Sequence, residues 1–251
     1  MAGWITHTII ADDLLRRLPA LDARGFCIGS IAPDCNIENA DWTAFTPPRE
    51  VTHFMRGKSK LTADCEGFWA EYVEGRRFAS AEEYAFFCGY YAHLITDVEY
   101  QRFGRDEARV SAMLARVKAE PTLAAQIAGM PETFDTCKAM FSRKRLCADI
   151  ARYESRYLRD NPDASYLTIL RPTEAFPDYL DFLPPGAIAR KIGIMATLPE
   201  ADGADGDGVF FTEAEYRRYL AQTSERIFML LDRRIGRHFS AAVRESEKIY
   251  Q

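Results

Sequence analysis

His93 and Asp97 lie four residues apart, within a stretch from Glu82 to Tyr100 that reads as one helix. Side chains four residues apart on a helix share a face, so this imidazole and this carboxylate point the same way. That geometry suits two ligands of one metal ion. The alternative is an ordinary hydrogen bond between a histidine and a carboxylate on a partly buried helix.

Three further ligand-type residues stand in unusual local contexts. They are His7 at the start of a helical pattern, Asp34 directly after Pro33, and His53. With the helical pair they supply three imidazoles and two carboxylates. A hydrolytic zinc site needs about three protein ligands and an open position for water. The set therefore covers one such metal ion, and two if a carboxylate bridges them.

Two of these three residues also have an ordinary structural reading. His7 alone would be a polar residue in a first helical turn, and Asp34 could cap the following turn, as aspartate often does. Trp4, three residues before His7, reads as a packing residue. The metal-site interpretation rests on all five residues occurring in one chain, not on any one of them.

Composition limits the function classes. The chain has 251 residues, 47% of them hydrophobic, and a formal net charge of -5. This length and apolar content suffice for one sizeable core. The negative charge argues against a nucleic-acid binder, which would usually carry a basic face. A small phosphate-containing substrate remains compatible, because a bound metal ion supplies local positive charge.

Targeting signals and cysteine usage favour a cytoplasmic protein. The segment from Met1 to His7 has no basic region followed by an apolar run, so it does not read as a secretory signal. No stretch approaches the roughly 20 apolar residues of a membrane span. The six cysteines form no Cys-x-x-Cys pair, and reduced thiols are the better interpretation without an export signal.

Helical periodicity dominates the elements that must position the candidate ligands. Ser80 and Thr212 each precede a glutamate by three residues, the pattern of a helix-capping box. Residues 36–48 read as a loop, and the proline-rich residues 161–185 as an irregular excursion. We therefore expect an all-α, single-domain helical bundle over residues 1–251, with an irregular excursion in the C-terminal half.

Four motifs in order resemble a known family. They are Trp4-x-x-His7, Gly29-Ser-Ile-Ala-Pro-Asp34, Thr52-His53-Phe54 and Tyr90-x-x-His93-x-x-x-Asp97. This order is similar to that of the bacterial zinc-dependent phospholipase C family, and more specifically to its short, unsecreted branch. The motifs span residues 4–97; beyond them the resemblance is limited to helical character.

The resemblance implies an all-α fold with a metal cluster between helices. Carried over motif by motif, Asp34, His53, His93 and Asp97 would surround one zinc ion. Asp97 could bridge to a second ion bound by His7. Asp34 also matches the residue proposed in the family as the base toward the attacking water.

Two departures from the secreted enzymes limit the expected cluster. Those enzymes use a mature N-terminal tryptophan as a ligand, whereas Trp4 is internal. They also carry two histidines and a glutamate downstream, whereas this chain has only His238 after His93. We therefore expect one or two zinc ions, with manganese, iron or nickel accepting similar ligands.

Two functions follow as hypotheses. The first is a metal-dependent hydrolase of phosphoester or phosphodiester bonds, in which a metal-activated water attacks phosphorus and Asp34 orients or deprotonates it. Its substrate would be a small phosphate-containing molecule or a lipid headgroup. The second is a catalytically inactive, metal-containing binding or regulatory protein of the same fold. The sequence does not indicate an oligomeric state.

Overall fold

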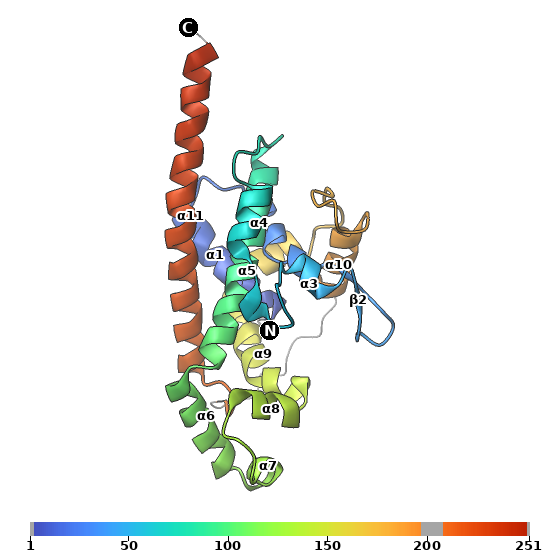
Figure 1. Ribbon diagram of the computed structural model, residues 1–251, viewed down its shortest axis with the longest axis vertical. Helices are drawn as coiled ribbons and strands as arrows, with labels where there is room; N and C mark the ends of the chain where they lie inside the picture. Colours follow the sequence, from blue (N-terminus) through green and yellow to red (C-terminus); the bar gives the residue numbers. More distant parts are fainter. Residues whose placement is uncertain (1–2, 197–207, 250–251) are drawn as a thin grey trace.

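The computed structural model describes residues 3–196 and 208–249. Its centre is helix α5 (Ala81–Gly104), which other helices surround (Figure 1). Most side chains of α5 are buried on every side, including the four consecutive residues from Phe86 to Gly89. A helix that is buried all round belongs to the core, and this one carries both His93 and Asp97.

Helix α2 (Ala23–Gly29) packs unusually close to α5. A Cβ atom added at Gly29 would lie 2.0 Å from the carbonyl oxygen of Phe86, and one at Gly89 would lie 2.2 Å from that of Phe26. Neither position has room for a side chain, so the two backbones meet through glycine. This close crossing brings the end of α2 against the face of α5 that carries His93.

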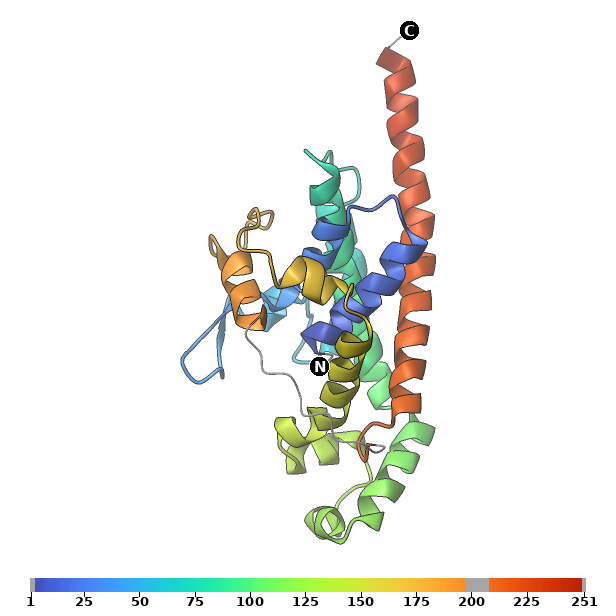
Figure 2. The same ribbon diagram turned by 180° about the vertical axis from the view of Figure 1, so that it is seen from behind.

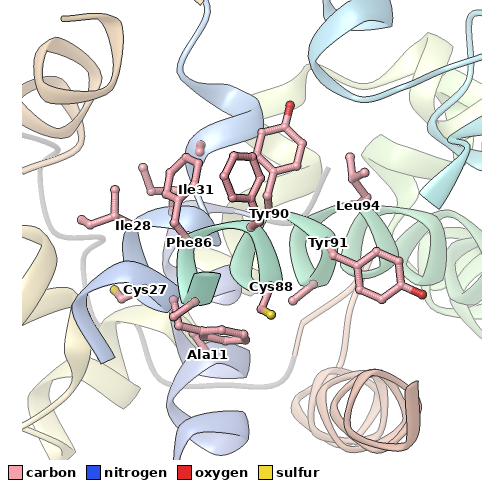
Figure 3. Packing of buried hydrophobic residues seen from close by; sticks show 14 of the residues in the cluster. Ala11, Cys27, Ile28, Ile31, Phe86, Cys88, Tyr90, Tyr91 and Leu94 are labelled. Atoms are coloured by element: carbon pink, nitrogen blue, oxygen red, sulfur yellow. The ribbon is translucent and has the colours of Figure 1, made fainter. Parts of the chain in front are cut away.

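Apolar side chains fill the space on both sides of this crossing (Figure 3). Ile28 and Ile31 lie with Phe86 and Tyr90 on one side of α5, and Ala11 lies near Cys88 on another. All of these residues are almost fully buried. The crossing is therefore held by a continuous apolar core, which fixes the polar residues that follow it in the sequence.

The segment after α2 carries two of the candidate ligands through short elements. These are η1 (Ala32–Asp34), the antiparallel strands β1 (Ile37–Glu38) and β2 (Phe45–Thr46), α3 (Arg49–Thr52), η2 (Lys60–Thr62) and α4 (Cys65–Tyr72). Asp34 ends η1, and His53 directly follows α3. Tyr90 of α5 donates a hydrogen bond to the carbonyl of Thr52, which ties this segment to the central helix.

Two helices from opposite ends of the chain flank α5. Helix α1 (Trp4–Arg17) and helix α11 (Glu213–Ile249) both pack against it, and α11 runs along one edge of the molecule in both views (Figures 1 and 2). His7 is the fourth residue of α1, which brings it to the centre of the molecule. No helix in residues 3–196 and 208–249 is both long and apolar enough to cross a membrane.

The rest of the chain adds smaller helical units. They are α6 (Glu107–Ala119), α7 (Pro121–Ile127), α8 (Phe134–Met140), α9 (Arg143–Asp160), η3 (Tyr166–Leu170) and α10 (Ala187–Ala196). Helices α6 to α8 form their own apolar cluster, separate from the main core. The segment between α9 and α10 is largely irregular apart from η3, yet Leu170, Leu180 and Leu183 are buried in the main core.

The expected all-α fold is confirmed, and the differences are local. The predicted loop at residues 36–48 contains the β1–β2 hairpin, which Glu38 fixes by an ion pair to Lys191 of α10. The Thr212 capping box is complete, with reciprocal bonds of 3.1 and 3.0 Å to Glu215. At Ser80 the box is displaced, because the Glu83 carboxylate accepts the backbone N–H of Ala79.

Candidate metal centre

The five candidate ligands converge on one buried point. Helix α1 supplies His7, η1 supplies Asp34, the end of α3 supplies His53, and α5 supplies His93 and Asp97. All five residues are at most 9% exposed. Two groups of three could each hold a metal ion: His7, His93 and Asp97, and Asp34, His53 and His93.

Backbone carbonyls orient two of the imidazoles. The Nδ1 atom of His93 lies 2.7 Å from the carbonyl oxygen of Ser30, and that of His53 lies 3.2 Å from the carbonyl oxygen of Arg49. A carbonyl oxygen can only accept, so each Nδ1 carries the hydrogen and each Nε2 keeps its lone pair. This arrangement is typical of metal-binding histidines.

Four distances among these ligand atoms match those of a zinc coordination shell. The Nε2 atom of His53 lies 3.3 Å from that of His93, 3.2 Å from Asp34 Oδ1 and 3.5 Å from Asp97 Oδ2. The Nε2 atom of His93 lies 3.2 Å from the same Asp97 oxygen. Ligands at zinc-binding distances around a tetrahedral ion would be separated by about 3.3 Å. The donor set and its spacing therefore fit one zinc ion.

His7 occupies the opposite side of His93. The two imidazole rings stack with their centroids 3.9 Å apart, and His7 Nε2 lies 4.0 Å from Asp97 Oδ1. Both ring nitrogens of His7 and this Asp97 oxygen are buried without a hydrogen-bond partner among the described residues. Buried polar atoms are rarely left unpaired in folded proteins, and a cation between His7 Nε2 and Asp97 Oδ1 would satisfy these two of the three atoms.

His93 also limits how many ions the cluster can hold tightly. Both three-residue groups use His93, but its Nδ1 is engaged with Ser30. Only Nε2 remains, and one lone pair binds one ion. An ion at the Asp34–His53 group would therefore leave His7 and Asp97 as the two protein ligands of a second, more weakly held ion.

The electrostatics keep the cluster in the ligand-competent protonation state. Burial lowers the pKa of His7 well below its usual value, and the neighbouring His93 lowers it further. Burial also lowers the pKa of His53 to about 4, so it is neutral near pH 7. For Asp97, burial alone would raise the pKa, but the charge of Lys60 opposes it, and the pKa is held well below its usual range.

Lys60 is the site residue that sequence reasoning missed. Its ammonium group contacts Asp97 Oδ2 and lies 3.8 Å from Asp34 Oδ1, although the residue comes from η2 and is only 8% exposed. Lysines in short polar segments are usually solvated, so nothing in the sequence except its proximity to His53 marked it. The ammonium group places a positive charge beside the two carboxylates.

Trp4 was expected from the sequence to be a packing residue, but it also orients a candidate ligand. Its indole N–H donates a hydrogen bond of 3.0 Å to Asp34 Oδ2. The Oδ1 atom of Asp34 is thereby left facing His53 and Lys60. Burial alone would raise the pKa of Asp34, but the Lys60 charge opposes it, and the pKa is held well below its usual range, which keeps the carboxylate ionised.

Comparisons with known proteins agree with this geometry. The sequence model of a family described as zinc dependent phospholipase C matches residues 6–99. That segment contains all five converging residues and Lys60. No curated protein and no solved structure matches the chain. Residues 100–251 lie outside the family match. Residues 6–99, which hold this zinc-compatible cluster of histidines and aspartates, are therefore similar to the zinc dependent phospholipase C family.

Proposed function

We propose that this protein is a metal-dependent hydrolase of phosphoester or phosphodiester bonds, with zinc as its metal. The observation that carries the proposal is the convergence of His7, Asp34, His53, His93 and Asp97 within the segment that matches the family. Burial of three unpartnered polar atoms there supports a bound cation instead of a network of structural hydrogen bonds.

The residues of the cluster would bind a metal ion and accept a proton. His53, His93, Asp34 and Asp97 would hold the tighter zinc ion. When bound, zinc lowers the pKa of water to about 7 and neutralises charge on phosphate oxygens. Asp34 is ionised, so it can accept a hydrogen bond or a proton from the attacking water. Trp4 keeps its other oxygen oriented.

Lys60 links this cluster to the surface. It contacts Asp97 inside and also lines an open hollow of about 600 Å³. A substrate phosphate that entered through the hollow would meet the Lys60 ammonium group before it reached the histidines. A fixed positive charge next to a reacting phosphate stabilises the charge that develops in the transition state.

A substrate screen tests the proposal. Zinc-loaded protein is assayed on a chromogenic phosphomonoester, a chromogenic phosphodiester and phospholipid vesicles. We expect phosphodiester hydrolysis that a chelator abolishes and zinc restores. Asp34→Asn should lower kcat by about 100-fold or more, the usual contribution of a proton acceptor. The matched control is Asp64→Asn, at an acidic residue that pairs with Arg56 at the surface.

The outcome also decides between the two functions. Bound zinc without turnover on any of the three substrate classes would contradict the enzyme. It would favour a metal-containing binding or regulatory protein of the same fold. One observation favours that second function: Lys60 already neutralises Asp97, a carboxylate that a catalytic metal ion would use.

A further inference from the structure

The hollow beside the metal cluster has a strongly basic lining. Its walls come from the β2–α3 segment, η2 and the loop before it, the end of α5 and α8. The charged residues among them are Arg49, Lys58, Lys60, Arg105 and Lys138, with Glu50 as the acidic member. The whole chain carries a net charge of -5. The positive charge is therefore concentrated at this place and does not reflect the general composition.

A second, neighbouring hollow has a mostly acidic lining. It measures about 520 Å³ and adjoins the basic hollow through Glu50 and Met55, which line both. Its charged lining is mostly acidic and its remaining walls are largely aromatic; the acidic members are Glu50, Asp64, Glu71 and Asp181. Two neighbouring hollows thus carry opposite charge, and the basic one is the hollow that reaches the cluster.

Not all cations of the basic hollow are available to a ligand. Lys60 is engaged with Asp97. Arg105 and Lys138 share Asp135, at 2.7 and 3.8 Å. These three side chains are therefore partly neutralised by carboxylates of the protein.

Arg49 and Lys58 differ from the other three. Neither forms an ion pair with a carboxylate within 4.0 Å among the described residues. The Arg49 guanidinium lies 4.0 Å from the centre of the Phe45 ring, which restricts its position without neutralising its charge. Arg49 is half-buried, while Lys58 is exposed. A positioned, uncompensated guanidinium in a hollow is suited to bind a phosphate or carboxylate.

We propose that the basic hollow binds a second anionic group of the substrate, so that the preferred substrate is a phosphoester with a further phosphate or carboxylate. The phosphate to be cleaved would lie at the cluster end, next to Lys60. The second anion would lie at Arg49 and Lys58. The proposal about the substrate's second group rests on the proposed hydrolase function, but the binding preference can be measured without turnover.

A matched pair of soluble probes tests the preference. Glycerophosphoglycerol has one phosphodiester, and bis(glycerophospho)glycerol has two. Binding of each to zinc-loaded protein is measured by isothermal titration calorimetry. We expect the second probe to bind about tenfold more tightly, the effect of one charge-assisted hydrogen bond. The difference should shrink as salt is added, because the pairing takes place in an open hollow.

Variants locate the preference in the hollow. Arg49→Gln combined with Lys58→Gln should remove most of the tenfold difference and leave binding of the one-phosphate probe nearly unchanged. The control is Arg56→Gln, which removes a cation that lines the acidic hollow and pairs with Asp64. This control should keep the full preference. Circular dichroism and zinc content verify that each variant is folded and loaded.

The outcomes separate this proposal from the proposed function. Equal affinity for the two soluble probes together with equal affinity for the two kinds of vesicle, or a preference that survives the double substitution, overturns the second-anion site. A preference without hydrolysis of either probe supports the site and counts against the hydrolase. Vesicles of phosphatidylglycerol and of cardiolipin repeat the comparison on a lipid surface. A preference confined to the vesicles assigns the second anion to a lipid headgroup, and one seen with the soluble pair assigns it to a free phosphoester.

Discussion

Two buried polar clusters contact helix α1 at consecutive residues, Thr6 and His7. They differ in whether their polar atoms have hydrogen-bond partners. Thr6 faces Glu154 of α9, whose Oε1 atom accepts bonds from the Thr6 backbone N–H at 2.8 Å and from its hydroxyl at 2.5 Å. The hydroxyl of Tyr216 completes this group at 2.8 Å. His7 faces His93 and Asp97, where three buried polar atoms have no partner among the described residues.

This contrast distinguishes a buried hydrogen-bond network that stabilises the fold from a candidate ligand-binding site. An unpaired buried donor or acceptor costs about 1–3 kcal/mol, so a cluster with three of them is unfavourable unless something binds there. The Glu154 cluster is complete within the protein and joins α1, α9 and α11. The His7 cluster is left with unpaired atoms among the described residues, of which a cation would satisfy His7 Nε2 and Asp97 Oδ1. Burial is similar in the two clusters, so burial alone does not identify the functional one.

The largest expected difference is the response of stability to zinc. Zinc at about 1,000 times its Kd should raise the free energy of unfolding by about 4 kcal/mol, because it binds only the folded cluster. His93→Ala removes the imidazole on which both candidate groups depend, so its stability should not respond. Urea titrations with zinc and with a chelator measure both.

The control for this experiment comes from the other cluster. Glu154→Gln should retain the full response to zinc. It also alters a buried residue, but one that binds Thr6, the neighbour of His7 in α1. If Glu154→Gln lost the response, or His93→Ala kept it, the two clusters would not differ as described.

The next effect concerns pH in the metal-free protein. Burial raises the pKa of Glu154 from 4.5 to about 7, although the Thr6 hydrogen bonds oppose this. The folded state then keeps a proton that the unfolded state releases, so Glu154 favours folding below pH 4.5 and this contribution is lost as pH rises to 7. The loss amounts to about 3 kcal/mol. His53, with its pKa lowered to about 4, has the opposite slope.

Glu154→Gln isolates the pH dependence of stability that is due to Glu154. The unfolding free energies of this variant and the wild type are measured in urea across the pH range 4.5 to 7. Between these limits the wild type should lose about 3 kcal/mol relative to the variant. A difference that stays constant with pH would mean that Glu154 is ionised in the folded protein throughout. The His53 slope is common to both proteins and cancels.

The smallest expected effect concerns the hydrogen bond that orients Asp34. Trp4→Phe keeps an aromatic ring but removes the indole N–H that binds Asp34 Oδ2. Zinc affinity should fall about tenfold, the lower end of the effect of losing a partner that orients a metal ligand. Competition with a chromogenic chelator measures it. An unchanged Kd would show that Asp34 does not depend on Trp4, or is not a ligand.

Local patterns in the sequence predicted much of this. The spacing of His93 and Asp97 placed both on one face of a helix, and Thr212 with Glu215 marked the start of α11. The resemblance added Asp34, His53 and His7, which come from separate elements and meet only through the close α2–α5 crossing.

Other features depend on long-range contacts that no local pattern encodes. Lys60 looks like a solvated residue in a short polar segment, and only the fold brings it to Asp97. The β1–β2 hairpin has two residues in each strand, too few for an alternating pattern, and its Glu38 is fixed by Lys191 more than 150 residues away. The basic hollow likewise combines cations from separate segments.

Zinc content of protein purified without a chelating tag tests the central claim most directly. Elemental analysis should find about one tightly held zinc ion per chain in the wild type and in Glu154→Gln. It should find almost none in His53→Ala, because that substitution removes an imidazole at the centre of the four-ligand group. A wild type without stoichiometric metal, or a His53→Ala variant with unchanged zinc, would contradict the metal centre described above.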